Sequence, residues 1–391
     1  MPSYSKWHQN EWEQPQLTPA VPPPAFATQY HQILQKLDDI DPIAYGKSRN
    51  FLWGAVTYLS PYISRGVLST RQVYEHMISR GYKLAPIEKF VSELAWRDYF
   101  QQVYRALGPQ LFTDIKQAQP QVAHRQLPAA LVQASTQIEA VDEAIRQLYH
   151  TGYMHNHMRM YVASIACNIG QAHWQKPAAW LYYHLLDADI ASNTCSWQWV
   201  AGSFSSKKYF CNQENINKYT GSRQRQSYLD VEYSQLPPAQ IPAPLLPTQN
   251  WAPVTNLPHT PPLQLKHNLP LLLYTHYNLD PLWHNQLEAN RILILEPSHF
   301  KQYPVSSRLI DFVLQLSQNI VGLQVFTGEL SELLAQWPVN PEAYGLKLIS
   351  KEHPAFAHWP GLKEEREWLA PQVKGYLPSF FAYWKKLIKY L

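Results

Sequence analysis

The sequence predicts two folded domains, an all-α domain followed by a small α/β domain with a parallel sheet. Apolar residues recur at helical spacing between about residues 25 and 233. After residue 269, short apolar runs typical of buried strands alternate with helical segments, which is the pattern of a parallel α/β sheet. With 391 residues, of which 46% are hydrophobic, the chain can bury at least one large core.

We expect four parts along the chain. Residues 1–24 form a polar N-terminal arm that ends in three prolines, and residues 25–233 form the all-α domain. Residues 234–268 are rich in Pro, Gln and Leu, which is typical of an extended linker. Residues 269–391 form the α/β domain.

Three long segments predict helices in the first domain. Residues 30–40 and 87–107 each place apolar residues on one face, and Pro86 suits the first turn of the second segment. Residues 136–152 end at Gly152, a typical helix C-terminus. Because no strand-like alternation is present in this part of the sequence, we expect no strand in it.

The second domain is expected to alternate strands and helices. Strands are predicted over residues 269–277, 291–297, 322–328 and 346–352. Helices are predicted between them, over residues 306–319 and 329–337.

Charge and cysteine content exclude some classes of protein. The formal net charge of +4 and the pI near 8.7 permit a nucleic-acid partner without requiring one. The three cysteines have no CxxC spacing, which argues against a disulfide framework or a zinc site and fits a reducing cytoplasm. The first residues lack the apolar core of a signal peptide, and no long uncharged apolar run is present. We therefore expect a cytoplasmic protein with no membrane partner and no metal.

The most unusual segment is residues 187–199, which combines two carboxylates, an amide and two indoles. That mixture is too polar for a plain core helix and too aromatic for a solvated loop. Residues 154–160 place Arg159, a fixed cation with a planar fork, on a nearby helix. Asp187 and Asp189 bracket a tight segment that can reach it. A flavin needs such a pair near its reactive edge, whereas a buried structural ion pair is the alternative.

Two further segments carry weaker signals. Thr57 and Ser60 lie at a helix start, where hydroxyls and backbone N–H groups suit a pyrophosphate, although Ser-Pro is usually only the beginning of a helix. Residues 93–100 place Glu93 and Trp96 on one helix, which alone indicates an amphipathic helix with a half-buried indole.

Taken in their order along the chain, these segments resemble the FAD-binding domain of the photolyase/cryptochrome family, over about residues 45–230. The resemblance implies FAD as the cofactor. The FAD-binding residues that it implies are Tyr45, Thr57, Tyr58, Leu59, Ser60, Trp96, Arg97, Asn156, Arg159, Asp187, Ala188, Asp189 and Asn193. The catalytic residues that it implies are Glu93, Trp96, Asn156, Met160, Asn193 and Trp199, with Trp197 and Trp174 as an electron path.

The sequence departs from this family in three places. His157 stands where the family has arginine, beside the cavity for damaged bases. No tryptophan lies between Trp96 and Trp174, so the third indole of the family's electron path is missing. Residues 203–230 replace a segment rich in Phe, Asn and Pro. Their cations, which suit phosphate contact but equally a solvated loop, are Lys207, Lys208, Lys218, Arg223 and Arg225.

The C-terminal part resembles the family's antenna domain, which in the family precedes the helical domain. Its strands and helices follow in the family's order, and residues 374–387 are similar to the segment that closes that domain. An unrelated α/β domain is the alternative, and the antenna pigment is left open.

The resemblance implies a lyase that repairs pyrimidine dimers in ultraviolet-damaged DNA, in duplex or single-stranded form, by light-driven electron transfer from reduced FAD. A cryptochrome-like blue-light sensor without repair activity is the alternative. His157 and the altered loop favour the sensor, whereas Glu93, Trp96 and Met160 favour repair. A nucleic-acid-binding protein with an empty pocket is a third class, against which the retained flavin-site residues argue.

Overall fold

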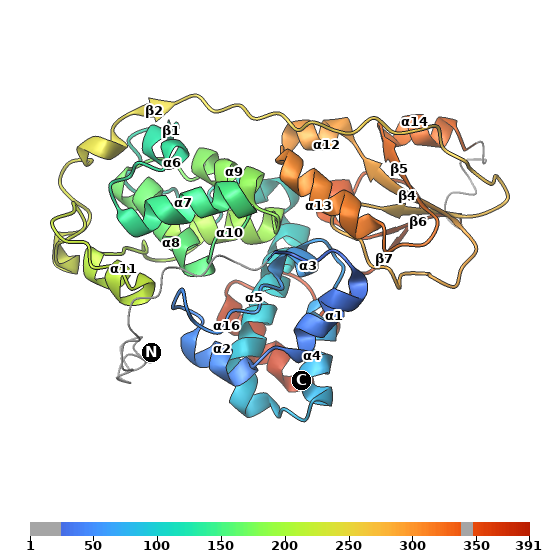
Figure 1. The fold of residues 1–391 in the computed structure, drawn as a ribbon, viewed down its shortest axis with the longest axis horizontal. Helices are drawn as coiled ribbons and strands as arrows, with labels where there is room; N and C mark the ends of the chain where they lie inside the picture. Colours follow the sequence, from blue (N-terminus) through green and yellow to red (C-terminus); the bar gives the residue numbers. More distant parts are fainter. Residues whose placement is uncertain (1–24, 338–346) are drawn as a thin grey trace.

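The structure is a computed structural model that describes residues 25–337 and 347–391. A helical region and a sheet region lie side by side (Figure 1). The helices of the first region are α1 (Tyr30–Asp38), α2 (Pro42–Ser48), α3 (Ser60–Ser64), α4 (Thr70–Ser79), α5 (Leu84–Leu107), α6 (Ala129–Gln133), α7 (Glu139–Thr151), α8 (Asn156–Ser164), α9 (Gln175–His184), α10 (Ile190–Ala201) and α11 (Gln213–Thr220). A 3-10 turn, η2 (Gly108–Phe112), follows α5, and a π-helical turn, η3 (Ile165–Ile169), continues α8.

The expected absence of strands from the helical region is wrong at one point. β1 (Leu127–Pro128) pairs antiparallel with β2 (Thr248–Gln249) from the segment that precedes the sheet. A ladder two residues long leaves no period-two pattern in the sequence. The pairing fastens that later segment to the helical region.

The sheet region confirms the predicted parallel α/β fold. Five parallel strands lie in the order β5-β4-β3-β6-β7. The strands are β3 (Leu271–Tyr274), β4 (Asn290–Leu295), β5 (Leu323–Thr327), β6 (Leu348–Lys351) and β7 (Leu362–Glu364). The helices of this region are α12 (Pro297–Gln302), α13 (Ser307–Ser317) and α14 (Leu330–Ala335). β7, which the sequence did not predict, is a short edge strand with little burial.

An extended segment joins the two regions and runs along the surface of both (Figure 1). It contains the short turns η4 (Tyr233–Gln235) and η5 (Ala243–Leu245). Thr255 Oγ1 donates to the Val305 carbonyl at 3.0 Å, and the Gln264 N–H donates to Gln324 Oε1 at 2.7 Å. Side chains and backbone groups of this segment are therefore anchored on the sheet region.

After the sheet, the chain returns to the helical region. α16 (Phe380–Leu387) lies beside α5 (Figure 1), and the turns η7 (Pro354–Phe356) and η8 (Ile388–Tyr390) complete the described elements. Tyr99 Oη of α5 donates to the Leu377 carbonyl at 3.0 Å, and Tyr74 Oη donates to the Leu391 carbonyl at 2.8 Å. The last residues therefore contact the helical region as well as the sheet region. The predicted division into four parts stays a prediction, and its N-terminal arm, residues 1–24, lies outside the described residues.

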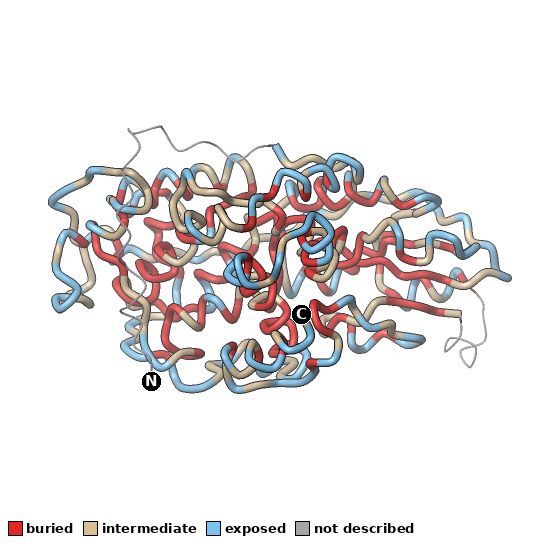
Figure 2. Tube along the Cα trace, turned by 90° about the horizontal axis from the view of Figure 1, so that it is seen from below, coloured by how far each residue is buried: buried red, intermediate tan, exposed pale blue. Residues whose placement is uncertain are grey.

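Buried chain runs through both regions (Figure 2). The loop after β3 packs directly against α3: the Leu279 N–H donates to the Arg65 carbonyl at 2.8 Å. Gly66 has φ +64, and a Cβ there would lie 2.4 Å from the Tyr277 carbonyl oxygen, so only glycine permits this approach. Of the helices in the described ranges, none has both the length and the apolar character that crossing a bilayer requires.

Candidate functional site

The loop between α9 and α10 is held in place by α3. Ser64 Oγ donates to the Asp187 carbonyl at 3.0 Å, and Arg65 Nη2 donates to the Ala188 carbonyl. The Asp189 carboxylate accepts the N–H of Ser192 at 2.7 Å and so caps the start of α10. These contacts fix the direction in which each aspartate of the loop points.

Arg159 and Asp187 form the ion pair expected from the sequence. Arg159 Nη2 lies 3.0 Å from the Asp187 carboxylate, and Arg159 Nε donates to the Met154 carbonyl at 2.8 Å. The Asp187 side chain is only 4% exposed, whereas Arg159 is 22% exposed. The guanidinium is therefore fixed from two sides while part of it faces outward.

Asp189, expected to reach Arg159 as well, is turned elsewhere. Its carboxylate lies 3.6 Å from Arg97 and accepts two hydrogen bonds from Gln101 Nε2, at 2.8 and 2.7 Å. Burial alone would raise the pKa of Asp189, but Arg97 and hydrogen bonds from Ser192 outweigh burial and hold this pKa below its ordinary value. Arg97 and Asp189 thus make a second, separate ion pair.

Tyr58 is held in a strained backbone conformation between two of the predicted flavin residues. Its φ is +54°, in the left-handed region that non-glycine residues rarely adopt. Its ring lies 5.2 Å from that of Tyr153, and the Arg159 guanidinium lies 5.6 Å from the same Tyr153 ring. Strain of this kind concentrates at functional sites. Tyr153, which the sequence analysis missed, therefore connects Tyr58 to the Arg159–Asp187 pair.

Three predicted FAD-binding residues, Thr57, Leu59 and Ser60, lie just before α3 or at its first position. Thr57 and Ser60 are half-buried, and the Thr57 hydroxyl accepts the Leu59 N–H at 3.4 Å. The Leu59 side chain is buried, so this residue can contribute only backbone groups to a ligand. Tyr45, on α2, is half-buried and packs edge-on against Phe90 at 5.3 Å.

Glu93 already has cationic partners. Its Oε1 lies 2.8 Å from Arg49 Nη2 and 3.2 Å from Lys89 Nζ. Arg49 follows α2, far from Glu93 in sequence, and no spacing in the chain indicated this contact. The negative charge of this carboxylate, which the resemblance assigns to bonding a damaged base, is thus balanced by two cations of the same chain.

Trp96 has one face covered. Its indole stacks on Phe380 with ring centroids 3.7 Å apart and 9° between the planes. The ring assigned to base stacking by the resemblance is therefore packed against the first residue of α16.

His157 is buried instead of lining an open cavity. Its Nδ1 lies 2.9 Å from the Asn50 carbonyl, and its ring lies 4.6 and 4.5 Å from the rings of Tyr161 and Tyr219. Burial lowers the pKa of His157 to about 4, against the opposing effect of the Asn50 hydrogen bond. The imidazole is therefore neutral at pH 7, so no positive charge stands where the family has arginine. Of its neighbours on α8, Asn156 is exposed and Met160 is half-buried against the core.

The remaining predicted residues lie on or near α10. Asn193 Nδ2 donates to the Ala178 carbonyl at 3.0 Å, and Trp199 is half-buried with its ring 6.0 Å from that of Tyr209. Trp197 and Trp174 are both buried. Of the basic residues in the segment after α10, which includes α11, Lys208 is half-buried, and the exposed ones are Lys207, Lys218, Arg223 and Arg225.

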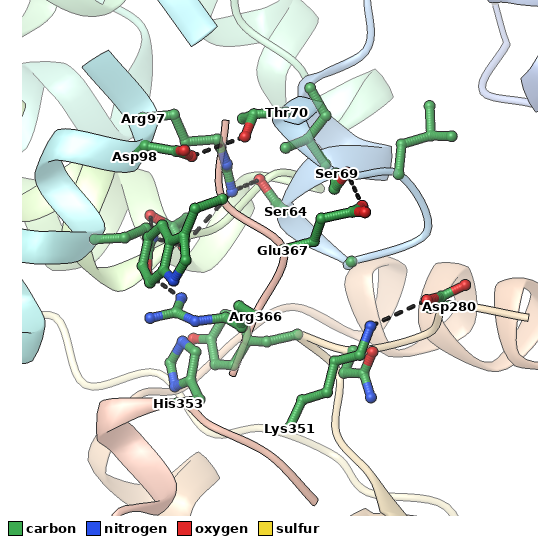
Figure 3. A pocket seen from close by; sticks show the side chains of 18 of the residues that line it. Ser64, Ser69, Thr70, Arg97, Asp98, Asp280, Lys351, His353, Arg366 and Glu367 are labelled. Atoms are coloured by element: carbon green, nitrogen blue, oxygen red, sulfur yellow. Dashed lines mark hydrogen bonds and ion pairs between the residues drawn. The ribbon is translucent and has the colours of Figure 1, made fainter. Parts of the chain in front are cut away.

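A crevice of about 100 Å³ lies between the helical region and the carboxyl ends of β3 and β6 (Figure 3). β4 and β5 lie on one side of β3, and β6 and β7 lie on the other. The strand order therefore reverses between β3 and β6, and ligands of such sheets bind at the carboxyl ends of the strands at this point. Arg97 and Asp189 line the crevice from the helical region, and Lys351 and His353 line it from the end of β6. Pockets for cofactor-sized ligands measure roughly 300–1,000 Å³. The crevice is therefore too small for FAD.

Comparisons with known proteins match the helical region. Residues 90–230 match the family model described as the FAD binding domain of DNA photolyase. A deoxyribodipyrimidine photo-lyase from Synechococcus sp. is 33% identical over 180 residues, which cover 44% of this chain and 37% of the relative. A cryptochrome DASH from Natronomonas pharaonis is 30% identical over 185 residues, which cover 45% of this chain and 39% of the relative. The crystal structure of a bacterial class III photolyase from Agrobacterium tumefaciens has a TM-score of 0.43 and 29% identity, covering 49% of this chain and 43% of that one.

The family match identifies an FAD-binding domain of the photolyase type within the helical region. In this domain the chain is similar to deoxyribodipyrimidine photo-lyases and to a cryptochrome DASH. The chain spans less than two fifths of the length of the two curated relatives, since 37% and 39% of them are covered.

The donor groups around Arg159 fit FAD. Among the described residues, Nη1 of Arg159 has no hydrogen-bond partner, although Nε and Nη2 are held by Met154 and Asp187. A fixed cation with one free N–H is a group that a polar ring edge can satisfy.

Proposed function

We propose that the protein binds FAD in its helical region and repairs pyrimidine dimers in DNA by light-driven electron transfer. The observation that supports this most is the Arg159–Asp187 pair, 3.0 Å apart, within the segment that matches the FAD-binding family. FAD supplies light absorption and one-electron chemistry when it is bound. The rest of the proposal concerns what the residues of this chain do for it.

Arg159 is the proposed partner of the flavin ring. The Asp187 carboxylate and the Met154 carbonyl hold the guanidinium plane, so a free N–H keeps a fixed direction. Asn193, Tyr45 and the hydroxyls of Thr57 and Ser60 are the proposed contacts for the rest of the cofactor. Their assignment follows the order of the family's segments.

DNA is the proposed partner. Relatives that match the helical region are deoxyribodipyrimidine photo-lyases. The exposed cations after α10 supply sequence-independent contacts to phosphates, which weaken as salt rises. These cations are Lys207, Lys218, Arg223 and Arg225.

A blue-light sensor without repair activity is the second candidate. Two contacts favour it: Phe380 covers the stacking face of Trp96, and Glu93 is already paired with Arg49. One of the relatives is a cryptochrome. In this candidate the flavin site is retained and only the cavity above it is closed.

One experiment separates the two candidates. The purified protein is examined for bound FAD by its absorption spectrum, then illuminated with blue light and a reductant in the presence of thymine-dimer DNA. Repair requires restored thymines in the light and none in the dark, with Asp187→Ala as the FAD-deficient control. Intact dimers from a protein whose FAD is reduced by light support the sensor, and a colourless protein that FAD does not reconstitute overturns both candidates.

A further inference from the structure

Trp174 is tied to a carboxylate. Its indole Nε1–H donates to Asp114 Oδ1 at 2.7 Å, which is short for such a bond. Asp114 Oδ2 accepts the Gln119 N–H at 2.9 Å, and Gln119 Oε1 accepts the Trp174 N–H at 2.9 Å. Gln119 therefore links the Asp114 carboxylate to the Trp174 backbone, in addition to the direct contact between the carboxylate and the indole.

The two partners differ in their access to water. Trp174 is 2% exposed, whereas the Asp114 side chain is 21% exposed. His173 Nε2 lies 3.5 Å from the same Asp114 oxygen. A proton that arrives on Asp114 can leave to solvent, directly or through His173, while the indole itself has no such route.

An electron path through Trp197 and Trp174 ends abruptly in this chain. No tryptophan lies between Trp96 and Trp174 in the sequence. Within the described part of the chain, the aromatic ring next to Trp174 is that of His173, with centroids 5.7 Å apart. Imidazole is a poor electron donor to an oxidised indole. The positive charge left on Trp174 must therefore be stabilised where it is, or the electron returns.

We propose that Asp114 is the proton acceptor for oxidised Trp174, an inference that rests on the proposed function. The oxidant is photoexcited FAD, which takes an electron from Trp197, and Trp197 then takes one from Trp174. The Nε1–H bond of Trp174 breaks and its proton moves along the existing hydrogen bond to Asp114 Oδ1. The products are a neutral indolyl radical and a carboxylic acid. The pair changes from a net charge of minus one to zero, which balances the loss of one electron.

This transfer takes the place of the missing indole. A deprotonated indolyl radical is harder to reduce than the indole radical cation, because its reduction must be coupled to return of the proton. The separated state then lasts long enough for an external reductant to act. An exposed third tryptophan achieves the same end by moving the charge to solvent, whereas here only the proton moves.

The test compares the parent protein with Asp114→Asn. The asparagine carbonyl still accepts the indole N–H but cannot take up its proton, so a purely structural contact is preserved. In this variant the Gln119 N–H loses its acceptor, Asp114 Oδ2, so the thermal stability of the variant is also measured. The readouts are transient absorption and electron paramagnetic resonance after a light flash, in H₂O and D₂O, and Trp174→Phe assigns the signal.

The parent should yield a neutral indolyl radical on Trp174 with a lifetime lengthened in D₂O. Asp114→Asn should yield the radical cation, with recombination faster by at least about tenfold, the factor for one pKa unit of driving force. Asp114→Glu should restore the neutral radical. In the dark, the indole N–H resonance of Trp174 should shift in Asp114→Asn, which reports on the hydrogen bond without any turnover.

A radical cation in the parent, or equal lifetimes in the parent and Asp114→Asn, overturns this inference alone. No light-induced radical in the FAD-loaded parent, or a radical that persists in Trp174→Phe, overturns both the inference and the predicted electron path through Trp197 and Trp174.

Discussion

Trp96 and Phe380 lie face to face, with ring centroids 3.7 Å apart and 9° between their planes. Trp96 belongs to α5 and Phe380 is the first residue of α16, so the end of the chain covers a ring near its beginning. Trp384, one turn further along α16, lies 6.2 Å behind Phe380 in a roughly parallel plane. A base that stacks on this face of Trp96 must first displace Phe380.

Phe380→Ala should uncover this face. We expect affinity for dimer-containing DNA, relative to undamaged DNA, to rise about fivefold or more, because stacking a base on an aromatic ring contributes about 1–3 kcal/mol. Loss of a buried Phe should also lower the free energy of unfolding by about 3–5 kcal/mol. Competition binding and denaturant unfolding measure the two effects.

Phe381→Ala is the matched control, since Phe381 is on the same helix and 62% exposed. It should change neither quantity appreciably. If Phe380→Ala is too unstable, Phe380→Leu keeps the core filled while removing the ring stack. Unaltered discrimination between damaged and undamaged DNA in both Phe380 variants would show that α16 does not restrict the site.

The sequence predicted helices and strands better than it predicted which distant residues contact one another. The parallel sheet and the Arg159–Asp187 pair follow from local features: strand-like apolar runs, and a cation and a carboxylate in segments whose order resembles one family. The Phe380 contact of Trp96 could not be predicted in this way. Helical spacing indicates that one face of α5 is apolar, but not which distant segment covers it.

The same limit explains why the partners of Asp189 and Glu93 were not predicted. Each is paired with an arginine, Arg97 and Arg49 respectively, and their assignment to the flavin site and the cavity stays a prediction. Asp189 also caps α10, which fixes its direction independently of any cofactor. Short elements such as β7 escaped prediction because three residues are too few to show a period.

Asp98 should make stability depend on pH. Burial raises its pKa to about 6, although the Leu369 N–H and the Thr70 hydroxyl oppose the shift. The folded protein thus binds this proton more tightly than the unfolded chain does. The contribution is fully present below the unfolded-state pKa near 4 and is lost as pH rises through about 6, a difference of about 3 kcal/mol.

Asp98→Asn cannot titrate, so the parent should lose stability relative to it between about pH 4 and pH 7. Urea unfolding of both proteins across this range measures the difference. A constant difference across the range would show that Asp98 is not held in its protonated form by burial.

Gly66→Ala should disturb the contact between α3 and the loop after β3. The new Cβ would lie 2.4 Å from the Tyr277 carbonyl oxygen. Gly81→Ala is the matched control, because Gly81 also has a positive φ, +88, but open space around its Cβ position. Both variants carry the strain of a positive φ at alanine, about 1 kcal/mol. Gly66→Ala differs from its control by adding a steric clash.

We expect Gly66→Ala to be less stable than Gly81→Ala by about 2 kcal/mol, within the usual range for overpacking. Thermal unfolding of both variants checks this. Equal stability would mean that the loop after β3 moves away from α3 without loss, so that the two regions are not held together there.

Asp187→Ala should remove FAD binding by releasing Arg159. The variant leaves the guanidinium with one strong contact, the Met154 carbonyl at 2.8 Å, and breaks a pair whose carboxylate is 4% exposed. Breaking such a pair should cost about 3 kcal/mol, near the lower end for buried pairs because Arg159 is partly exposed. FAD content after purification and unfolding in denaturant measure the two effects.

Asp38→Ala is the control for loss of an aspartate from an ion pair, because Asp38 contacts His76 at 2.9 Å with 69% of its side chain exposed. It should leave FAD content unaltered and change stability by less than about 1 kcal/mol. Asp187→Asn separates charge from shape, since the amide can still accept a hydrogen bond from Arg159 but carries no charge. FAD loss in both Asp187 variants, with normal content in Asp38→Ala, is the expected result. Full FAD occupancy in Asp187→Ala would place the flavin away from the Arg159–Asp187 pair.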